Sequence, residues 1–196
     1  MRKKILFLAG MMACSSLAGA QEISKTWVAD KGNGTYQNPV LHADYSDPDI
    51  CAAGDDFYMT ASSFNCIPGI PILHSNDLVN WSLVNYALPV QEPESFFDKA
   101  QHGKGVWAPA IRFHNGEFYI YWGDPDYGIY MIKTKDPKGK WSKPVLVKAG
   151  KGMIDATPLW DEDGKVYLIH AYAGSRSGVN SILVICELNP EGTEVI

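Results

Sequence analysis

The sequence predicts an all-β protein of the β-propeller class, because a pattern of short strands returns along the chain. The dipeptides Phe57-Tyr58 and Phe118-Tyr119 lie 61 residues apart, as do Pro48 and Pro109. Val166-Tyr167 repeats the pattern 48 residues further on. Repeats of about 50–60 residues, each with about four strands, are typical of propeller blades. An irregular β-sandwich with accidental internal similarity is the alternative.

Short turn signals separate the predicted strands. Gly54-Asp55, Asn115-Gly116 and Asp163-Gly164 each stand one residue before a repeated dipeptide. Asn-Gly and Asp-Gly pairs tolerate the positive φ angles of tight hairpins. Helical periodicity is not sustained in any segment, and residues 95–100 are expected to form one helical turn at most.

Residues 36–196 have room for three such repeats, which begin near Asp47, Trp107 and Asp155. Propellers close with about four to eight blades. Three blades would form an incomplete arc with two exposed sheet edges, which favours aggregation. We therefore expect this chain to be part of a longer protein or a truncated product.

The N-terminus has the pattern of a secretory signal peptide. Basic residues occupy positions 2–4, an apolar run covers positions 5–12, and small residues precede Gln21. Cleavage between Ala20 and Gln21 is expected, which predicts a secreted or periplasmic protein. The apolar run is too short to span a bilayer. A lipoprotein signal at Cys14 is the less favoured alternative, because the leucine expected three residues earlier is absent.

Removal of the signal peptide would leave an acidic chain. The full chain has 17 Lys and Arg against 22 Asp and Glu, and its first 20 residues carry three of the basic residues and none of the acidic ones. Residues 21–196 therefore have 14 basic and 22 acidic residues, a net charge of −8. This argues against nucleic acid or an anionic membrane as a partner and favours a neutral ligand. Residues 21–35 are polar and contain glycine, and are predicted to be a linker.

Three cysteines follow the signal peptide, at Cys51, Cys66 and Cys186. In an oxidising compartment a Cys51–Cys66 disulfide is one hypothesis, and three buried thiols are the other. No spacing in the sequence matches a zinc site, so no metal ligands are predicted.

Asp47 and Asp155 are the candidate catalytic residues. Asp47 precedes the first strand of the first repeat, and Asp155 occupies nearly the same position in the third. Matching Leu159 to Ile50 leaves Asp155 one residue early, which predicts a local irregularity. Two carboxylates that converge on one pocket suit general acid–base catalysis on a neutral substrate, and Trp107 at the second repeat offers a flat apolar face to a sugar ring. In the alternative interpretation, each of the two aspartates caps the turn that precedes its strand.

From residue 36 to its end the chain resembles glycoside hydrolase family 43, and in particular the β-xylosidases of that family. The resemblance rests on ordered motifs, which are Asn38-Pro39-Val40-Leu41, Tyr45-Ser46-Asp47-Pro48-Asp49-Ile50, Ser62-Ser63-Phe64, Pro68-Gly69-Ile70-Pro71-Ile72, Ser75-Asn76-Asp77-Leu78-Val79-Asn80-Trp81, Gly105-Val106-Trp107-Ala108-Pro109-Ala110-Ile111 and Met153-Ile154-Asp155-Ala156-Thr157-Pro158-Leu159-Trp160. It implies a five-bladed β-propeller, of which this chain would supply an incomplete arc of about three blades, residues 36–196.

The resemblance also implies roles for four residues. Asp47 matches the general base that activates water, and Asp155 matches the aspartate that adjusts the pKa of the general acid and orients it. Phe64 and Trp107 match aromatic residues that line the pocket for the terminal sugar. The family inverts the anomeric carbon, which requires a carboxylate base and a protonated carboxylic acid on opposite sides of the bond.

The function implied is that of an exo-acting β-1,4-xylosidase, which hydrolyses xylo-oligosaccharides or arabinoxylan-derived substrates without a cofactor. An α-L-arabinofuranosidase and a non-catalytic carbohydrate-binding propeller are the alternatives. The family often holds a structural calcium ion in the central channel. Because the ligands of that ion lie mostly in later blades, calcium is an expectation for a full-length protein only.

The general acid of the family has no match in this sequence. In the family it is a glutamate in a Glu-Gly-Pro-like segment that opens the fourth blade. Glu187, Glu191 and Glu194 stand outside such a segment, and Glu191-Gly192 is followed by Thr193 in a predicted turn. We therefore expect this chain alone to be inactive or nearly so.

Overall fold

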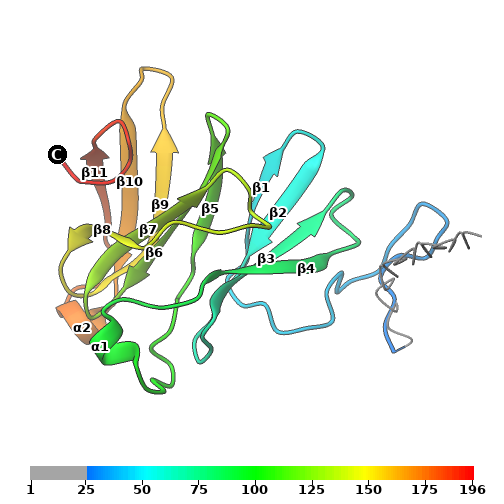
Figure 1. Cartoon of the computed structure of the whole chain (residues 1–196), viewed down its shortest axis with the longest axis horizontal. Coiled ribbons are helices and arrows are strands. Elements are labelled where there is room, and N and C mark those ends of the chain that lie inside the picture. Colours follow the sequence, from blue (N-terminus) through cyan, green and yellow to red (C-terminus); the bar gives the residue numbers. More distant parts are fainter. Residues whose placement is uncertain (1–25) are drawn as a thin grey trace, which may run out of the picture.

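The computed structural model describes residues 26–196 as an all-β arrangement of three antiparallel sheets (Figure 1). The signal peptide predicted at residues 1–20 lies outside the described residues. The first sheet contains β1 (Asp49–Ala53), β2 (Asp56–Thr60), β3 (Gly69–Ser75) and β4 (Ser82–Leu88). The second contains β5 (Ala110–His114), β6 (Glu117–Asp124), β7 (Gly128–Thr134) and β8 (Val145–Ala149). The third contains β9 (Met153–Trp160), β10 (Val166–Tyr172) and β11 (Leu183–Leu188).

The three sheets coincide with the three predicted repeats, and strands that follow one another in the chain are neighbours in each sheet. The three predicted hairpins are confirmed, because β1 pairs with β2, β5 with β6 and β9 with β10 across the expected turns. The short helix α1 (Glu94–Phe97) overlaps the single helical turn predicted at residues 95–100. A second short helix, α2 (Gly174–Ser177), was not predicted. No helix within residues 26–196 has the length and apolar character needed to cross a membrane.

The second sheet lies between the other two, and its strand β6 is therefore buried on both faces (Figure 1). Phe118, Ile120 and Trp122 belong to the apolar core shared with the first sheet, whereas Tyr119 and Tyr121 belong to the core shared with the third. Successive residues of a strand point to opposite faces. A strand buried on both faces therefore needs an unbroken apolar run, which residues 118–122 provide.

The first strands of the three sheets, β1, β5 and β9, lie side by side and run in the same direction (Figure 1). Arg112 of β5 connects them. Its Nη1 donates to the carboxylate of Asp49 in β1, and its Nη2 donates to Oγ1 of Thr157 in β9 at 2.8 Å. The same oxygen of Asp49 also accepts the backbone amide of Ile111 at 2.8 Å. Charged hydrogen bonds therefore join the three sheets in addition to apolar packing.

The cysteines correct both hypotheses drawn from the sequence. Cys51, Cys66 and Cys186 are free thiols. Cys51 is buried in β1 and belongs to the core between the first and second sheets, while Cys66 is exposed in the connection between β2 and β3. A Cys51–Cys66 disulfide is therefore absent, since one thiol points into the core and the other into solvent. The hypothesis of three buried thiols is also wrong, because Cys66 is exposed and Cys186 is half-buried.

Replacement of Arg112 by methionine should lower the free energy of unfolding by about 1–2 kcal/mol, because the partly buried carboxylate of Asp49 loses its charged partner. Urea denaturation measures the change. Lys165→Met is the matched control, since Lys165 pairs with Glu187 at 3.1 Å on an exposed face and its loss should cost only a few tenths of a kcal/mol. Equal effects of the two substitutions would contradict the role given to Arg112.

Candidate active site

The four predicted site residues come from three sheets and lie at one end of them, which we call the mouth: the end at which β1, β5 and β9 begin (Figure 1). Asp47 lies two residues before β1, and Trp107 lies three residues before β5. Asp155 is the third residue of β9. Phe64 lies in the connection between β2 and β3, which returns to the mouth because the two strands are antiparallel.

The strand register places Asp155 and Asp47 at equivalent positions. The tyrosines of the three repeated dipeptides pair with Cys51, Arg112 and Leu159. Asp47 stands four residues before Cys51, and Asp155 stands four residues before Leu159. The match of Leu159 to Ile50 was therefore wrong by one residue. The irregularity expected at Asp155 is nevertheless present, because the pairing of β9 with β10 shifts between Ile169 and Ala171.

A left-handed backbone conformation marks the same position in all three sheets. Asp47 has φ 50°, Ala108 has φ 35° and Asp155 has φ 56°. Residues other than glycine rarely adopt this conformation, and when they do they are concentrated at functional sites. Aspartate tolerates it better than most side chains. Among the positive-φ residues of the described chain, one therefore lies at the start of each inner strand, and two of these three are the predicted catalytic residues.

The carboxylate of Asp47 is fixed by two hydroxyl groups. Ser62 donates to Oδ2 of Asp47 at 2.6 Å, and Ser46 donates to the same oxygen at 3.0 Å. Oγ of Ser62 also accepts the backbone amide of Ala108 at 2.8 Å, so one hydroxyl links Asp47 to the residue that follows Trp107. Within residues 26–196, Oδ1 of Asp47 has no hydrogen-bond donor, which leaves this oxygen available to water or substrate.

Asp155 is influenced electrostatically by Asp47. Protein atoms around the carboxyl of Asp155 remove part of its solvent, and this desolvation raises its pKa. The negative charge of Asp47 raises the pKa of Asp155 further, because a nearby like charge disfavours the ionised form. The two carboxyl groups are therefore near enough to interact electrostatically, although both residues remain exposed.

Phe64 and Trp107 form one aromatic wall because their loops are joined through the backbone. Ser63 and Val106 exchange two backbone hydrogen bonds at 2.9 and 3.1 Å, and Gly105 donates to the carbonyl of Phe64 at 2.9 Å. A Cβ atom at Gly105 would lie 2.1 Å from the Ser63 carbonyl oxygen, so this approach requires glycine. The rings of Phe64 and Trp107 meet edge to face, with centroids 6.3 Å apart.

The described residues do not fit a metal ion. Within residues 26–196, no group of three or more His, Cys, Asp or Glu side chains could hold one. The structural calcium ion that the family resemblance implies stays an expectation for a full-length protein.

The three glutamates near the end of the sequence do not reach the mouth. Glu187 lies in β11 opposite Tyr167 and pairs with Lys165. Glu191 and Glu194 follow in the turn after β11, where Asn189 and Glu194 are hydrogen-bonded. This turn lies at the end of the third sheet away from the mouth (Figure 1). Glu187, Glu191 and Glu194 are therefore not placed to serve as the general acid beside Asp47 and Asp155.

Ser62 was given no role from the sequence, although its motif was noted. Its contacts with Asp47 and Ala108 span 15 and 46 residues, and no local pattern encodes them. Asp126 and Arg176 also lie near Trp107 and were not predicted as site residues. The segment that contains Asp126 has the ordinary composition of a turn.

Two carboxyl groups and an aromatic pair at one end of an all-β scaffold are compatible with an enzyme that hydrolyses glycosidic bonds. Comparison with known families agrees with this class. The sequence model of the glycosyl hydrolases family 43 matches residues 36–196. The chain therefore belongs to glycosyl hydrolase family 43.

Individual relatives are similar over most of this chain. A beta-xylosidase of Formosa agariphila is 34% identical over 98% of this chain and 36% of its own length. A non-reducing end alpha-L-arabinofuranosidase of Bacteroides ovatus is 37% identical over 69% of this chain and 26% of its own length. The crystal structure of a GH43 protein from a capybara gut metagenome superposes with a TM-score of 0.67 at 34% identity, over 81% of this chain and 30% of that one. The chain thus spans about a third of the length of these relatives.

Substitution of Asp47 by asparagine should lower the pKa of Asp155 toward its ordinary value, because a negative charge that disfavours ionisation is removed. An NMR titration of the Asp155 side-chain carboxyl carbon measures the change. Asp44→Asn, at an exposed aspartate three residues earlier, is the control and should leave the pKa of Asp155 where it was. An unchanged pKa in Asp47→Asn would show that the two carboxyl groups do not share a space.

Proposed function

We propose that this chain carries the general base and the orienting aspartate of an inverting, exo-acting glycoside hydrolase that acts on xylan-derived oligosaccharides. The observation that carries the proposal is the position of Asp47 and Asp155, which lie at equivalent positions of two sheets and are close enough for the charge of Asp47 to raise the pKa of Asp155. Phe64 and Trp107 lie at the same end of the sheets, and Ser62 links Asp47 to the residue after Trp107. The names of the relatives support xylosides as substrates, because a beta-xylosidase matches nearly the whole chain.

In the proposed mechanism Asp47 takes a proton from water through Oδ1, while Oδ2 remains bound to Ser46 and Ser62. The activated water then attacks the anomeric carbon from the side of Asp47. Asp155 orients the general acid and acts on its pKa through its charge. Phe64 and Trp107 hold the terminal sugar and exclude water from its apolar face.

An inverting reaction also needs a carboxylic acid on the opposite side of the bond. Glu187, Glu191 and Glu194 lie away from the mouth and the sequence contains no Glu-Gly-Pro-like segment, so we propose that the acid comes from residues outside this sequence. We therefore propose that the 196-residue chain does not hydrolyse xylosides by itself, and that a protein of the relatives' length does.

We also propose that the three sheets are the first three blades of a five-bladed β-propeller. Two apolar faces support it. On the third sheet Leu183 and Ile185 are 73% and 67% exposed, and on the first sheet Ile50 and Met59 line an open groove with Pro48. Apolar sheet faces of this kind are normally covered by further structure. Secretion or a periplasmic location remains a prediction from residues 1–20.

Two other functions use the same site. An α-L-arabinofuranosidase activity is the second candidate, and the matching arabinofuranosidase of Bacteroides ovatus favours it. A non-catalytic carbohydrate-binding propeller is the third, in which Asp47 would only accept hydrogen bonds from sugar hydroxyls. Turnover of aryl β-xylosides against aryl α-L-arabinofuranosides separates the first two, and absence of turnover with retained sugar binding identifies the third.

The test compares three proteins on an aryl xyloside: this chain, a protein in which it continues to the relatives' length, and the Asp47→Asn variant of the longer protein. We expect no ordinary turnover by the chain alone and turnover by the longer protein. Asp47→Asn should lower turnover by about 10²-fold to 10⁴-fold or more, because the base is lost, while xylobiose binding remains. Ordinary turnover by the chain alone, or by Asp47→Asn, would refute the proposal.

A further inference from the structure

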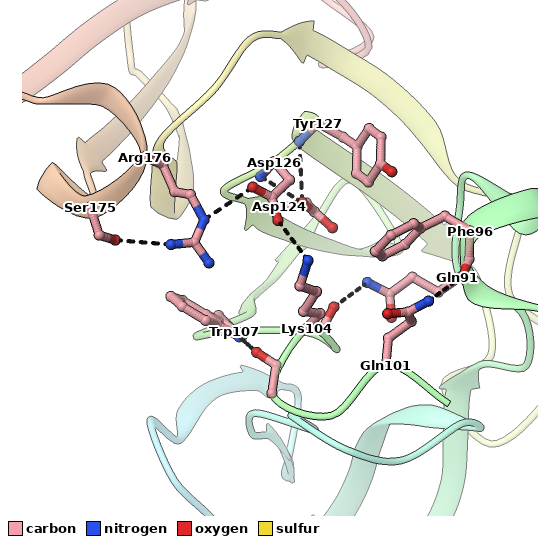
Figure 2. A network of polar contacts seen from close by, with 11 residues as sticks. Gln91, Phe96, Gln101, Lys104, Trp107, Asp124, Asp126, Tyr127, Ser175 and Arg176 are labelled. Carbon is pink, nitrogen blue, oxygen red and sulfur yellow. Dashed lines mark hydrogen bonds and ion pairs between the residues drawn. The ribbon is translucent and has the colours of Figure 1, made fainter. Parts of the chain in front are cut away.

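The turn that joins β6 to β7 lies at the centre of a polar network near the mouth (Figure 2). Oδ1 of Asp124 accepts the backbone amides of Asp126 at 2.9 Å and Tyr127 at 3.2 Å. Asp124 is only 3% exposed. The two hydrogen bonds that the buried carboxylate of Asp124 accepts fix the backbone of the turn, and with it the point from which the side chain of Asp126 extends.

The carboxylate of Asp126 contacts two cations that belong to different parts of the chain. Its Oδ1 accepts a hydrogen bond from Nε of Arg176 in α2 at 3.0 Å, and its Oδ2 lies 3.8 Å from Nζ of Lys104. Lys104 stands three residues before Trp107, in the connection from the first sheet to the second. Figure 2 shows both cations directed at Asp126, and all three side chains line one small hollow with Trp107.

The backbone of the same turn supports the strand that carries Asp155. The carbonyl of Pro125 accepts the amide of Gly152 at 2.7 Å, and the carbonyl of Gly152 accepts the amide of Ala173 at 2.7 Å. Gly152 directly precedes β9, and Ala173 directly precedes α2. A Cβ atom at Gly152 would lie 2.5 Å from Cβ of Ser177, so α2 is in close contact with the start of β9.

We propose that Asp126 is a positioning residue of the sugar pocket, which holds the Trp107 loop and α2 against the start of β9. The inference rests on the proposed function, because it concerns the binding of sugar at the mouth. An exposed ion pair often contributes little to a protein. Asp126 differs from such a pair in two respects: its backbone is held by the buried Asp124, and its one carboxylate joins segments that belong to the second and third sheets and to the connection from the first.

The test replaces Asp126 by asparagine, which keeps the shape of the side chain and removes its charge. Hydrogen exchange of residues 101–107 and 173–178 is measured together with xylobiose binding, which is followed by tryptophan fluorescence. We expect faster exchange in both segments and an affinity lower by about threefold to fivefold, with little change in the midpoint of global unfolding. Asp126→Glu should restore part of the affinity, because it restores the charge.

Glu187→Gln is the matched control, since it breaks an exposed ion pair with Lys165 at the far end of the third sheet and should alter neither measurement. Unchanged exchange in Asp126→Asn would overturn the inference, and so would faster exchange with unchanged affinity. If neither the wild-type chain nor the longer protein binds xylobiose, the proposed function loses its support. The exchange measurement then decides by itself whether Asp126 holds the two segments.

Discussion

The contact on which the rest of the structure depends is that of Arg112 with Asp49 and Thr157. The first strand of the second sheet, β5, contacts the first strands of the other two sheets, β1 and β9, and these three strands carry the mouth. Apolar packing between sheets is not directional, so it does not by itself fix how far one inner strand slides past the next. A guanidinium group that donates to β1 and β9 from β5 does fix it, because its donors have a rigid geometry. This contact therefore helps to set the position of Asp47 relative to Asp155 along the direction of the strands.

The left-handed residues at the mouth depend on the same arrangement. A strained backbone persists only where its surroundings determine it strongly. At Asp47 the surroundings are the hydroxyls of Ser46 and Ser62, and at Ala108 they are Ser62 again. Ser62 therefore connects the conformation of the first sheet to that of the second. The side chain that completes the environment of Asp47 also sets the start of the strand behind Trp107, so the base and the aromatic wall are positioned together.

The local and repeated features of the chain could be predicted from its sequence. The three hairpins and the extent of the three sheets follow from turn residues and from repeat spacing. The location of Asp47, Asp155, Phe64 and Trp107 at one end of the sheets follows from the repeat and the family motifs, while their catalytic and binding roles stay predictions. The details that were missed or wrong are set by contacts between distant segments. The register of β9 was off by one residue because Leu159 and Ile50 are equally apolar, and only the pairing with Tyr167 distinguishes them. The exposure of Cys66 depends on the path of a loop whose position is set by Gly105 and Phe64, and nothing near Cys66 in the sequence encodes it.

The electrostatics of the mouth indicate what a third carboxyl group would experience there. Asp155 already has a raised pKa, caused first by desolvation and then by the charge of Asp47. A glutamic acid brought to the opposite side of the same space would face two acidic groups in a partly desolvated setting, and both effects favour its protonated form. That is the state a general acid must have before it donates a proton to the leaving oxygen. Under the proposed function, the two aspartates would therefore also favour the protonated form of that partner.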